Sequence, residues 1–343
     1  MVVVMKAGAT EEDIERVAAK VREAGGEAHV VRGQFRKIVG LVGDTEKFLS
    51  LPLATLPGVE SVVRIGKPYK LVARESHPAL SDVNVGPATI SRRTFTLIAG
   101  PCAVETREQA LEAARAAKAA GATILRGGAY KPRSSPYSFQ GLGEEGLEIL
   151  KECRAETGLP VVTEVLEARD VETVAGAADA LQIGTRNMQN FALLREVGKS
   201  GVPTMLKRGF SATVEEWLMA AEYIAREGNA DIFLCERGIR TFEPWTRNTL
   251  DLGGMVVAQS ETHLPVIVDP SHAMGKRALV EPMARAALAA GADGVMVDVH
   301  CHPEEALVDG PQALEPEDLV RLGAELAALA HAVGRPFAGE PAT

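Results

Sequence analysis

The segment TFTLIAGPCAVE, residues 94–105, shows the unit from which most of the chain is built. A short apolar run reaches Ala99 and breaks at Gly100-Pro101, and an alanine-rich helical pattern follows. Cys102 therefore lies in the turn that leads from a strand to a helix. Open α/β sheets and β/α barrels place their reactive groups at this end of a strand. A free cysteine is more often a small buried hydrophobic residue, so Cys102 alone assigns no function.

The strand-then-helix unit recurs along the chain. Strands are predicted at TLIAG (96–100), TILRGG (123–128), PVVTEV (160–165), ALQIG (180–184), PTMLKRG (203–209), DIFLCERG (231–238), PVIVDPS (265–271) and GVMVDVH (294–300). Amphipathic helices separate them, among them 105–120, 144–157, 213–227 and 276–290, and a last helix is predicted at 315–333. Eight such units match a (β/α)8 barrel in size and order. An open doubly wound sheet is the alternative.

Residues 1–68 are predicted to form a separate small domain. Strands are expected at 2–7, 29–33, 36–43 and 59–66, and helices at 10–26 and 45–56. The order βαββαβ is that of a ferredoxin-like fold. Because no reactive cluster occurs in it, we expect a regulatory module, with a purely oligomer-building module as the alternative. Residues 69–93 are expected to form a linker whose hairpin closes one end of the barrel at 94–343.

Composition limits the classes of function. The 343 residues include 46% hydrophobic and 24% charged residues, which is ordinary for a globular enzyme. A net charge of −9 argues against a general nucleic-acid binder. The four cysteines show no CxxC pair, and neither a signal peptide nor an apolar membrane span is evident, so we expect a cytoplasmic protein. Cys153 and Cys235 are expected in the core.

Charged or reactive residues follow almost every predicted strand, at the face where β/α barrels carry their active sites. In strand order they are Cys102; Arg126, Lys131 and Arg133; Glu164; Arg186; Lys207 and Arg208; Glu236 and Arg237; Asp269 and His272; Asp298, His300 and His302. Six of the cations face one cavity in this arrangement: Arg126, Lys131, Arg133, Arg186, Lys207 and Arg237. Guanidinium groups match phosphate and carboxylate, so the cavity is predicted to take polyanionic substrates.

A second group of side chains suits a divalent transition metal. Cys102, His272, Asp298 and Asp309 combine one thiol, one imidazole and two carboxylates, a donor set for Mn, Fe, Co, Zn or Cd. The spacing contains no compact ligand motif. His300 and His302 are a rival ligand pair, because residues two apart in a strand share a face.

Several motifs resemble the 3-deoxy-D-arabino-heptulosonate 7-phosphate (DAHP) synthases. They are AGPCAVE (99–105), LRGGAYKPRSSPYSFQGLG (125–143), QIGTRNMQN (182–190), LKRG (206–209), CERGIRTFE (235–243), DPSHAMGKR (269–277) and DVHCHPEEALVDG (298–310). The resemblance spans the whole barrel in the correct order. It is closest to the type I beta form, which carries an N-terminal ferredoxin-like domain.

The resemblance implies a metal-dependent condensation of phosphoenolpyruvate with erythrose 4-phosphate, the first step of the shikimate pathway of aromatic amino acid biosynthesis. It implies one divalent ion per subunit on Cys102, His272, Asp298 and Asp309, and no organic cofactor. It assigns phosphoenolpyruvate to Arg126, Lys131, Arg186, Lys207 and Arg237, with Glu164 and Asp309 also at the substrate site. It assigns erythrose 4-phosphate to Lys131, Pro132, Arg133 and Ser134. Lys131, Cys102 and His272 are the expected catalytic residues, phenylalanine or tyrosine the expected effector, and a homotetramer the expected assembly.

The sequence departs from the family pattern at three positions: Asp298 replaces a glutamate, Ser134 replaces a threonine, and Met274 replaces another threonine. Two alternatives to this function stay open. One is 3-deoxy-D-manno-octulosonate 8-phosphate synthase, which has a KANR-type run where this chain has Lys131-Pro132-Arg133. The other is a catalytically silent barrel that binds a phosphorylated metabolite.

Overall fold

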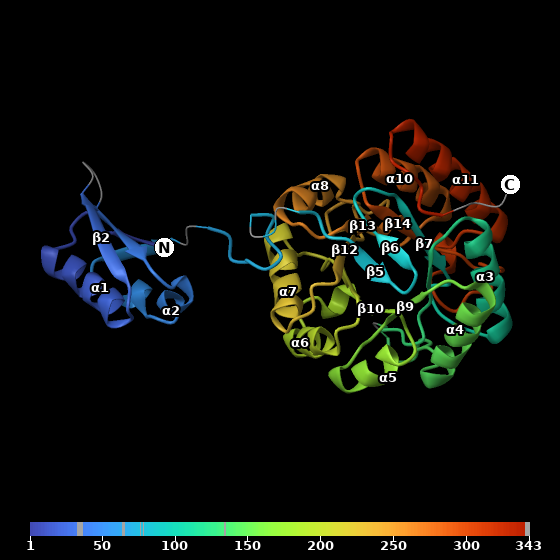
Figure 1. The fold of residues 1–343 in the computed structure, drawn as a ribbon, viewed down its shortest axis with the longest axis horizontal. Coiled ribbons are helices and arrows are strands. Elements are labelled where there is room, and N and C mark those ends of the chain that lie inside the picture. The colour runs from blue at the N-terminus through green and yellow to red at the C-terminus, as the bar shows by residue number, and fades with distance from the viewer. Residues whose placement is uncertain (33–36, 64–65, 76, 78, 134, 340–343) are drawn as a thin grey trace. The chain divides into compact units, whose positions relative to one another are not determined.

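A computed structural model describes residues 1–32, 37–63, 66–75, 77, 79–133 and 135–339 of the chain (Figure 1). The chain divides into two compact units, Met1–Pro68 and Tyr69–Thr343. Each unit has a hydrophobic core of its own. Among the described helices, none is both long enough and apolar enough to cross a membrane.

The first unit is the predicted βαββαβ domain. Its elements are β1 (Val2–Met5), α1 (Glu11–Glu23), β2 (Glu27–Arg32), β3 (Lys37–Val42), α2 (Thr45–Leu49) and β4 (Val59–Val63). The sheet order is β2-β3-β1-β4, and all neighbouring strands are antiparallel. A capping box starts α1, because the Thr10 side chain accepts from the Asp13 N–H and Asp13 accepts from the Thr10 N–H.

The second helix of this unit is shorter than predicted. The expected helix at 45–56 ends at Leu49, and only a 3-10 turn, η1 (Leu53–Thr55), follows. Pro52 lies between the two. Proline lacks an N–H and disfavours helical geometry in the residue before it, which explains the break.

The second unit confirms the predicted (β/α)8 barrel. Its strands are β7 (Thr96–Gly100), β8 (Ile124–Arg126), β9 (Val161–Glu164), β10 (Ala180–Ile183), β11 (Thr204–Lys207), β12 (Ile232–Glu236), β13 (Val266–Val268) and β14 (Gly294–Asp298). All are parallel, and β14 pairs with β7 to close the barrel. The surrounding helices are α3 (Arg107–Ala119), α4 (Glu144–Thr157), α5 (Val171–Ala175), α6 (Phe191–Ser200), α7 (Val214–Arg226), α8 (Leu252–Glu261), α10 (Arg277–Ala289) and α11 (Pro316–Ala332).

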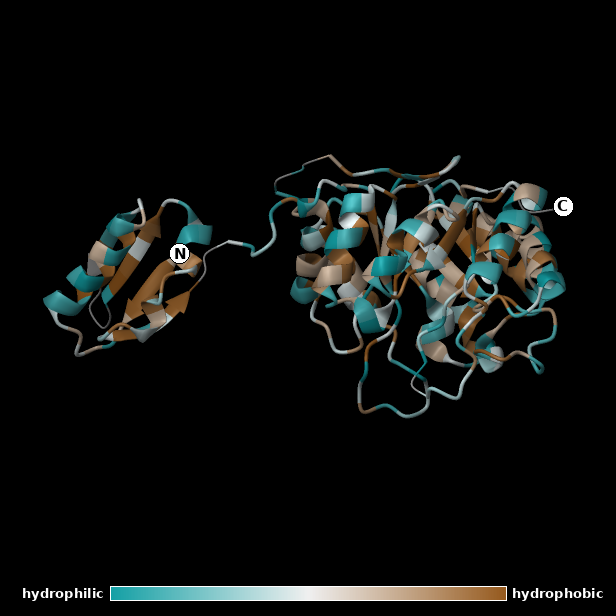
Figure 2. Ribbon diagram, turned by 90° about the horizontal axis from the view of Figure 1, so that it is seen from below, coloured by the Kyte–Doolittle hydropathy of each residue, from teal (hydrophilic) through white to brown (hydrophobic). Residues whose placement is uncertain are grey.

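The barrel interior is apolar and is closed at one end by a hairpin. The hairpin consists of β5 (Val83–Val85) and β6 (Ala88–Ile90), joined by a turn at Gly86. Its buried side chains pack with those of the barrel strands, including Ile98, Met205 and Phe233. Figure 1 shows the hairpin lying across the barrel inside the surrounding helices, and Figure 2 shows brown strands between helices that carry teal segments. The hairpin leaves the carboxyl ends of the strands as the open end.

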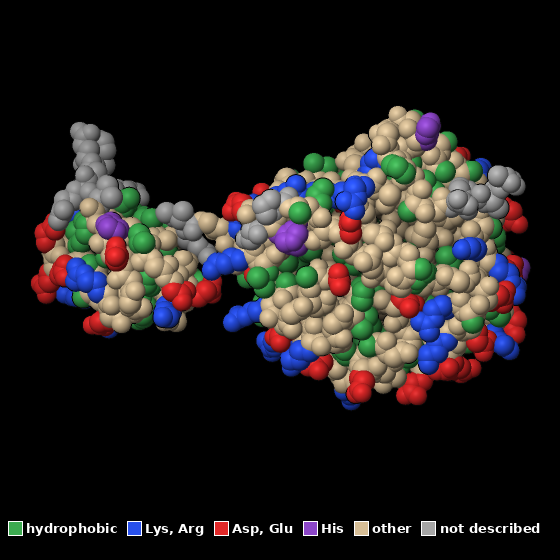
Figure 3. Space-filling view, viewed as in Figure 1, with side chains coloured by type: hydrophobic (Ala, Val, Ile, Leu, Met, Phe, Trp, Pro, Cys, Tyr) green, Lys and Arg blue, Asp and Glu red, His purple; other side chains and the backbone are tan. Residues whose placement is uncertain are grey.

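The exposed face of the barrel that carries the hairpin has charges of both signs. Figure 3 shows acidic and basic side chains interspersed around its edge, with no broad field of one sign. Cys153 and Cys235 are buried, as expected from their positions in a helix and a strand. Burial and neighbouring carboxylates raise the pKa of the Cys153 thiol to about 11, so it is a packing residue and not a reactive one.

Candidate active site

A cavity of about 270 Å³ opens at the carboxyl ends of the strands. Among the described residues that line it are seven cations, Arg126, Lys131, Arg133, Arg186, Lys207, Arg237 and Arg247, and two carboxylates, Glu164 and Asp309. The first six cations are those predicted from the strand ends. Ser134 lies outside the described residues, whereas Pro132 lines the cavity. An excess of positive charge in a concave site suits an anionic ligand.

The buried cations are fixed by protein partners before any ligand arrives. The Lys207 Nζ atom is 2.6 Å from the Asp269 carboxylate. Arg237 donates to the Asn248 side chain at 2.8 Å and to the His272 carbonyl at 3.0 Å. Burial lowers the pKa of Arg237, and the Asp269 carboxylate opposes that effect. Cations held in this way bind an anion without first losing side-chain freedom.

Phe210 forms an apolar wall beside these cations. The guanidinium carbons of Arg237 and Arg186 lie 4.8 and 5.7 Å from the centre of its ring. A guanidinium over an aromatic face keeps its N–H groups directed sideways and is attracted by the ring. Phe210 therefore orients two arginines toward the same part of the cavity.

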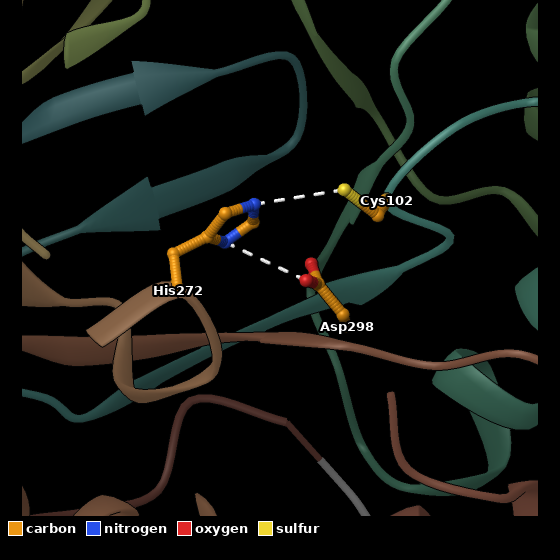
Figure 4. Close-up of side chains that lie close together, drawn as sticks. All are labelled: Cys102, His272 and Asp298. Atoms are coloured by element: carbon orange, nitrogen blue, oxygen red, sulfur yellow. Dashed lines mark hydrogen bonds and ion pairs between the residues drawn. The ribbon is translucent and has the colours of Figure 1, made fainter. Parts of the chain in front are cut away.

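Three potential metal ligands meet beside the cavity, and two of them, His272 and Asp309, line it. The Cys102 Sγ atom is 3.5 Å from His272 Nε2, and the Asp309 Oδ2 atom is 3.4 Å from each of them. Metal–ligand bonds of about 2.0–2.3 Å in a tetrahedral site place neighbouring ligand atoms roughly 3.3–3.6 Å apart. The three atoms thus have the separations that a shared divalent ion requires. Figure 4 shows the Cys102 and His272 side chains pointing toward each other.

The His272 ring is oriented by Asp269. The Asp269 carboxylate caps the short helix α9 (Pro270–Met274) by accepting the His272 N–H, and it also lies 2.8 Å from Nδ1. This contact leaves Nε2 facing Cys102. Burial alone would lower the pKa of His272, but Asp269 and Asp298 outweigh it and raise the pKa to about 10. The same negative field favours any cation at this position, either a proton or a metal.

Asp298 lies near the same ring nitrogen of His272 that Asp269 contacts. Its Oδ2 atom is 3.5 Å from His272 Nδ1, and its Oδ1 atom is 3.3 Å from Arg126 Nη1 (Figure 4). Asp298 is fully buried, and Oδ1 accepts no hydrogen bond from the described residues. Cys102, His272 and Asp298 thus form a second group of three whose ligand atoms all lie within 4.8 Å of one another.

The rival pair His300 and His302 is not part of this group. His300 Nε2 lies 3.4 Å from the Glu105 carboxylate, and the His302 side chain is 62% exposed beside Glu304. Both line a different cavity from the one that contains His272. The structure therefore places the two histidines apart from the predicted thiol and carboxylates.

Two further predicted residues lie at the site. The Lys131 Nζ atom donates to the Cys102 carbonyl at 2.9 Å and is 3.3 Å from Cys102 Sγ. Lys131 thus lies between the cations and the thiol. Glu164, at the end of β9, accepts from the Gln182 amide at 2.9 Å and is buried.

Sequence reasoning missed some residues that build the site. Arg247 lines the cavity from the loop between β12 and α8, where no strand end or motif signals its role. Phe210 also lines the cavity, and as one of several scattered phenylalanines it had no distinguishing pattern. The sequence places Asp269 at the end of a predicted strand, but its contacts with Lys207 and His272 depend on the three-dimensional fold.

Comparison with known families explains this geometry. Residues 87–334 match the model of the DAHP synthetase I family, and residues 1–67 match that of the DAHP synthase ferredoxin-like domain. The chain belongs to the DAHP synthetase I family. The predicted family is therefore confirmed over both units.

Similar proteins of known name distinguish the DAHP synthase activity from the octulosonate synthase activity. The chain is 51% identical over 334 residues to phospho-2-dehydro-3-deoxyheptonate aldolase from Thermotoga maritima, covering 97% of this chain and 99% of that protein. A crystal structure of that DAHP synthase matches with a TM-score of 0.91, at 50% identity over 98% of each chain. The 2-dehydro-3-deoxyphosphooctonate aldolase from Hydrogenovibrio crunogenus is 36% identical over 237 residues, or 63% of this chain and 83% of that protein. The full-length match supports DAHP synthase over the octulosonate enzyme.

Proposed function

We propose that the barrel condenses phosphoenolpyruvate with erythrose 4-phosphate in a metal-dependent reaction that forms DAHP and phosphate. The observation that carries this proposal is that seven cations line one cavity together with His272 and Asp309, which contact Cys102. Two phosphorylated substrates account for the cations. The sulfur, nitrogen and oxygen donors account for one divalent transition metal.

The proposed binding of the donor follows from the fixed cations. Lys207 and Arg237, which are oriented by Asp269 and Asn248, would bind the phosphoenolpyruvate anion together with Arg186. Arg126 and Lys131 would complete that subsite. The acceptor phosphate would lie near Arg133, which lines the cavity and donates to the Phe139 carbonyl at 3.3 Å.

The proposed ligands of the metal ion are Cys102, His272, Asp298 and Asp309. A bound divalent ion supplies Lewis-acid polarisation of the acceptor's carbonyl group. Asp269 fixes the His272 ring so that Nε2 faces the site. This mixed sulfur, nitrogen and oxygen donor set suits Mn, Fe, Co, Zn or Cd.

The carbon–carbon bond forms when C3 of phosphoenolpyruvate attacks the aldehyde carbon of erythrose 4-phosphate. The aldehyde oxygen then takes a proton, for which Lys131 Nζ is the proposed donor because it lies beside Cys102. One water adds at C2 of the former enol phosphate. That water loses one proton, which restores the Lys131 ammonium group. The C2–O bond to the phosphate then breaks, and phosphate leaves with the electron pair of that bond and takes the proton of the new C2 hydroxyl, so that C2 becomes the ketone carbon of DAHP. The cations hold both substrates in reacting distance and offset their charge.

We expect a clear preference for the four-carbon acceptor. Pro132 removes a backbone donor and stiffens the chain beside Arg133, so the slot should suit erythrose 4-phosphate better than arabinose 5-phosphate. Phosphate release measured with each sugar and phosphoenolpyruvate should favour erythrose 4-phosphate by more than about tenfold in kcat/KM. Equal efficiency with the pentose would favour the octulosonate reaction, and no release with either sugar would favour a silent binding barrel.

Metal removal should abolish turnover. A chelator-treated protein should regain activity with Mn²⁺ or a similar ion, and elemental analysis should find about one ion per chain. Cys102→Ser and His272→Ala should each lower metal content at least tenfold, because each removes a ligand. The matched control is His302→Ala, whose side chain is exposed outside the cavity. Loss of metal from the His302 variant, with retention in the Cys102 and His272 variants, would reverse the assignment.

Replacing the proposed proton donor should affect rate more than donor binding. Lys131→Met should lower kcat by about 10²- to 10⁴-fold, the usual contribution of a general acid. Its phosphoenolpyruvate dissociation constant, measured by calorimetry, should rise by less than about tenfold because several cations remain. Lys199→Met, on the exposed face of α6, is the control. A Lys131 variant with unchanged kcat contradicts the assignment.

The first unit is proposed to regulate the barrel and not to complete its active site. Every described lining residue of the cavity lies after Pro68. The proposed effector is phenylalanine or tyrosine, and the proposed assembly is a cytoplasmic homotetramer. An effector can inhibit only to the extent that it binds the less active state more tightly than the active state.

A shortened chain separates regulation from catalysis. A chain that begins at Tyr69 keeps the hydrogen bonds that hold this segment to the barrel. The Tyr69 hydroxyl donates to Glu261, and the Leu71 and Val72 N–H groups donate to Glu222. We expect it to retain activity within about threefold and to lose inhibition by aromatic amino acids. A folded but inactive shortened chain would mean that the first unit contributes to the site. If neither phenylalanine nor tyrosine inhibits the activity of the full-length protein, this regulatory role is wrong.

A further inference from the structure

We infer that Arg247 and Gln312 form a clamp that positions the carboxylates proposed to bind the metal. The inference rests on the metal-dependent function proposed above. Neither residue is a proposed metal ligand. Gln312 does not line the cavity, and Arg247 lines it but is assigned to no particular substrate group. Both act through other side chains, so they are positioning residues.

The clamp consists of three hydrogen bonds in series. Arg247 Nη1 donates to Asp309 Oδ1 and to Gln312 Oε1, each at 2.9 Å. Gln312 Nε2 in turn donates to Asp298 Oδ2 at 2.7 Å. One guanidinium group is thereby connected to both carboxylates, directly to Asp309 and through one amide to Asp298.

The direction of the Gln312 amide follows from its partners. Its oxygen faces a cation that can only donate, and its nitrogen faces a carboxylate that accepts. The reverse orientation would place two donors together at one end and two acceptors together at the other. Gln312 is also 2% exposed, so water cannot readily replace a lost bond.

Arg247 is itself fixed against the helix that carries His272. Its backbone N–H donates to the Met274 carbonyl at 3.1 Å, and the next N–H, from Asn248, donates to Ala273 at 2.8 Å. A Cβ atom at Gly275 would lie 2.6 Å from Arg247 Cβ, so the loop and the end of α9 are in direct contact. The clamp therefore connects the backbone around His272 to both carboxylates.

The backbone at Asp309 needs such support. With φ of 57°, Asp309 is the one non-glycine residue in the left-handed region within the described part of the chain. L-residues adopt this conformation at an energetic cost, which surrounding contacts must offset. Asp309 precedes the turn η4 (Gly310–Gln312), and Arg247 bonds to both ends of that four-residue segment. Its guanidinium group thus stabilises the conformation in which Asp309 Oδ2 faces Cys102 and His272.

The test compares metal retention in three variants. Gln312→Met keeps the side-chain length without the hydrogen bonds, and Gln312→Glu keeps an acceptor for Arg247 but faces Asp298 with a second carboxylate. Arg247→Met removes the guanidinium group. Arg195→Met, exposed on α6, is the control. Each protein is loaded with Co²⁺, and the release of cobalt to excess chelator and the thiolate–cobalt absorption band are recorded, with circular dichroism to verify folding.

We expect all three variants to hold Co²⁺ about 10- to 100-fold more weakly than the parent, with a shifted or weakened absorption band, while the control stays within about twofold. Phosphoenolpyruvate binding to metal-free Gln312→Met should stay within about threefold of the parent, since Gln312 does not line the cavity. If the folded variants release cobalt as slowly as the parent, the proposed role of the clamp is wrong, but the proposed metal dependence is unaffected. A parent chain that binds no metal would overturn the clamp and the proposed metal dependence together.

Discussion

The buried carboxylate of Asp269 joins the two functional parts of the site. It is fully buried between the Lys207 ammonium group and the His272 ring, and it caps the helix on which His272 lies. Burial alone would raise the pKa of Asp269, but His272 and Lys207 outweigh it and hold that pKa well below its ordinary value. The carboxylate therefore stays charged, and it orients both the Lys207 ammonium group, proposed to bind an anion, and the His272 ring, proposed to bind a metal.

The barrel makes this arrangement possible by separating apolar and polar ends. The hairpin side chains of Val83, Val85 and Ile90 fill the barrel at one end with aliphatic groups. Charged side chains at that end of the interior would be costly to bury. The opposite end is open, and the carboxyl ends of all eight strands surround it. Charged residues from distant parts of the sequence therefore line one cavity.

The sequence predicted the barrel well because each parallel strand is buried on both faces and appears as a continuous apolar run. The six predicted cations line the cavity because they lie at or after the carboxyl ends of barrel strands, and the barrel topology places all these ends around one cavity. Arg247 could not be found in this way, since its place depends on a loop folded against Met274 and Ala273. The helix predicted at 45–56 was too long for a different reason. The hydrophobic pattern continues past residue 50, but the backbone geometry that Pro52 imposes does not allow the helix to continue.

The charges of the site also indicate where the two substrates should meet. The Asp298 and Asp309 carboxylates beside the Cys102 thiol favour a cation, and the arginines that line the cavity favour phosphate and carboxylate groups. Lys131 lies between them, with its ammonium group 3.3 Å from the thiol. A carbonyl oxygen that gains negative charge as a carbon–carbon bond forms is best stabilised at this boundary, where the proposed proton donor and the proposed metal site adjoin. A barrel that only bound phosphorylated metabolites would need the cations and not the thiol, imidazole and carboxylates beside them.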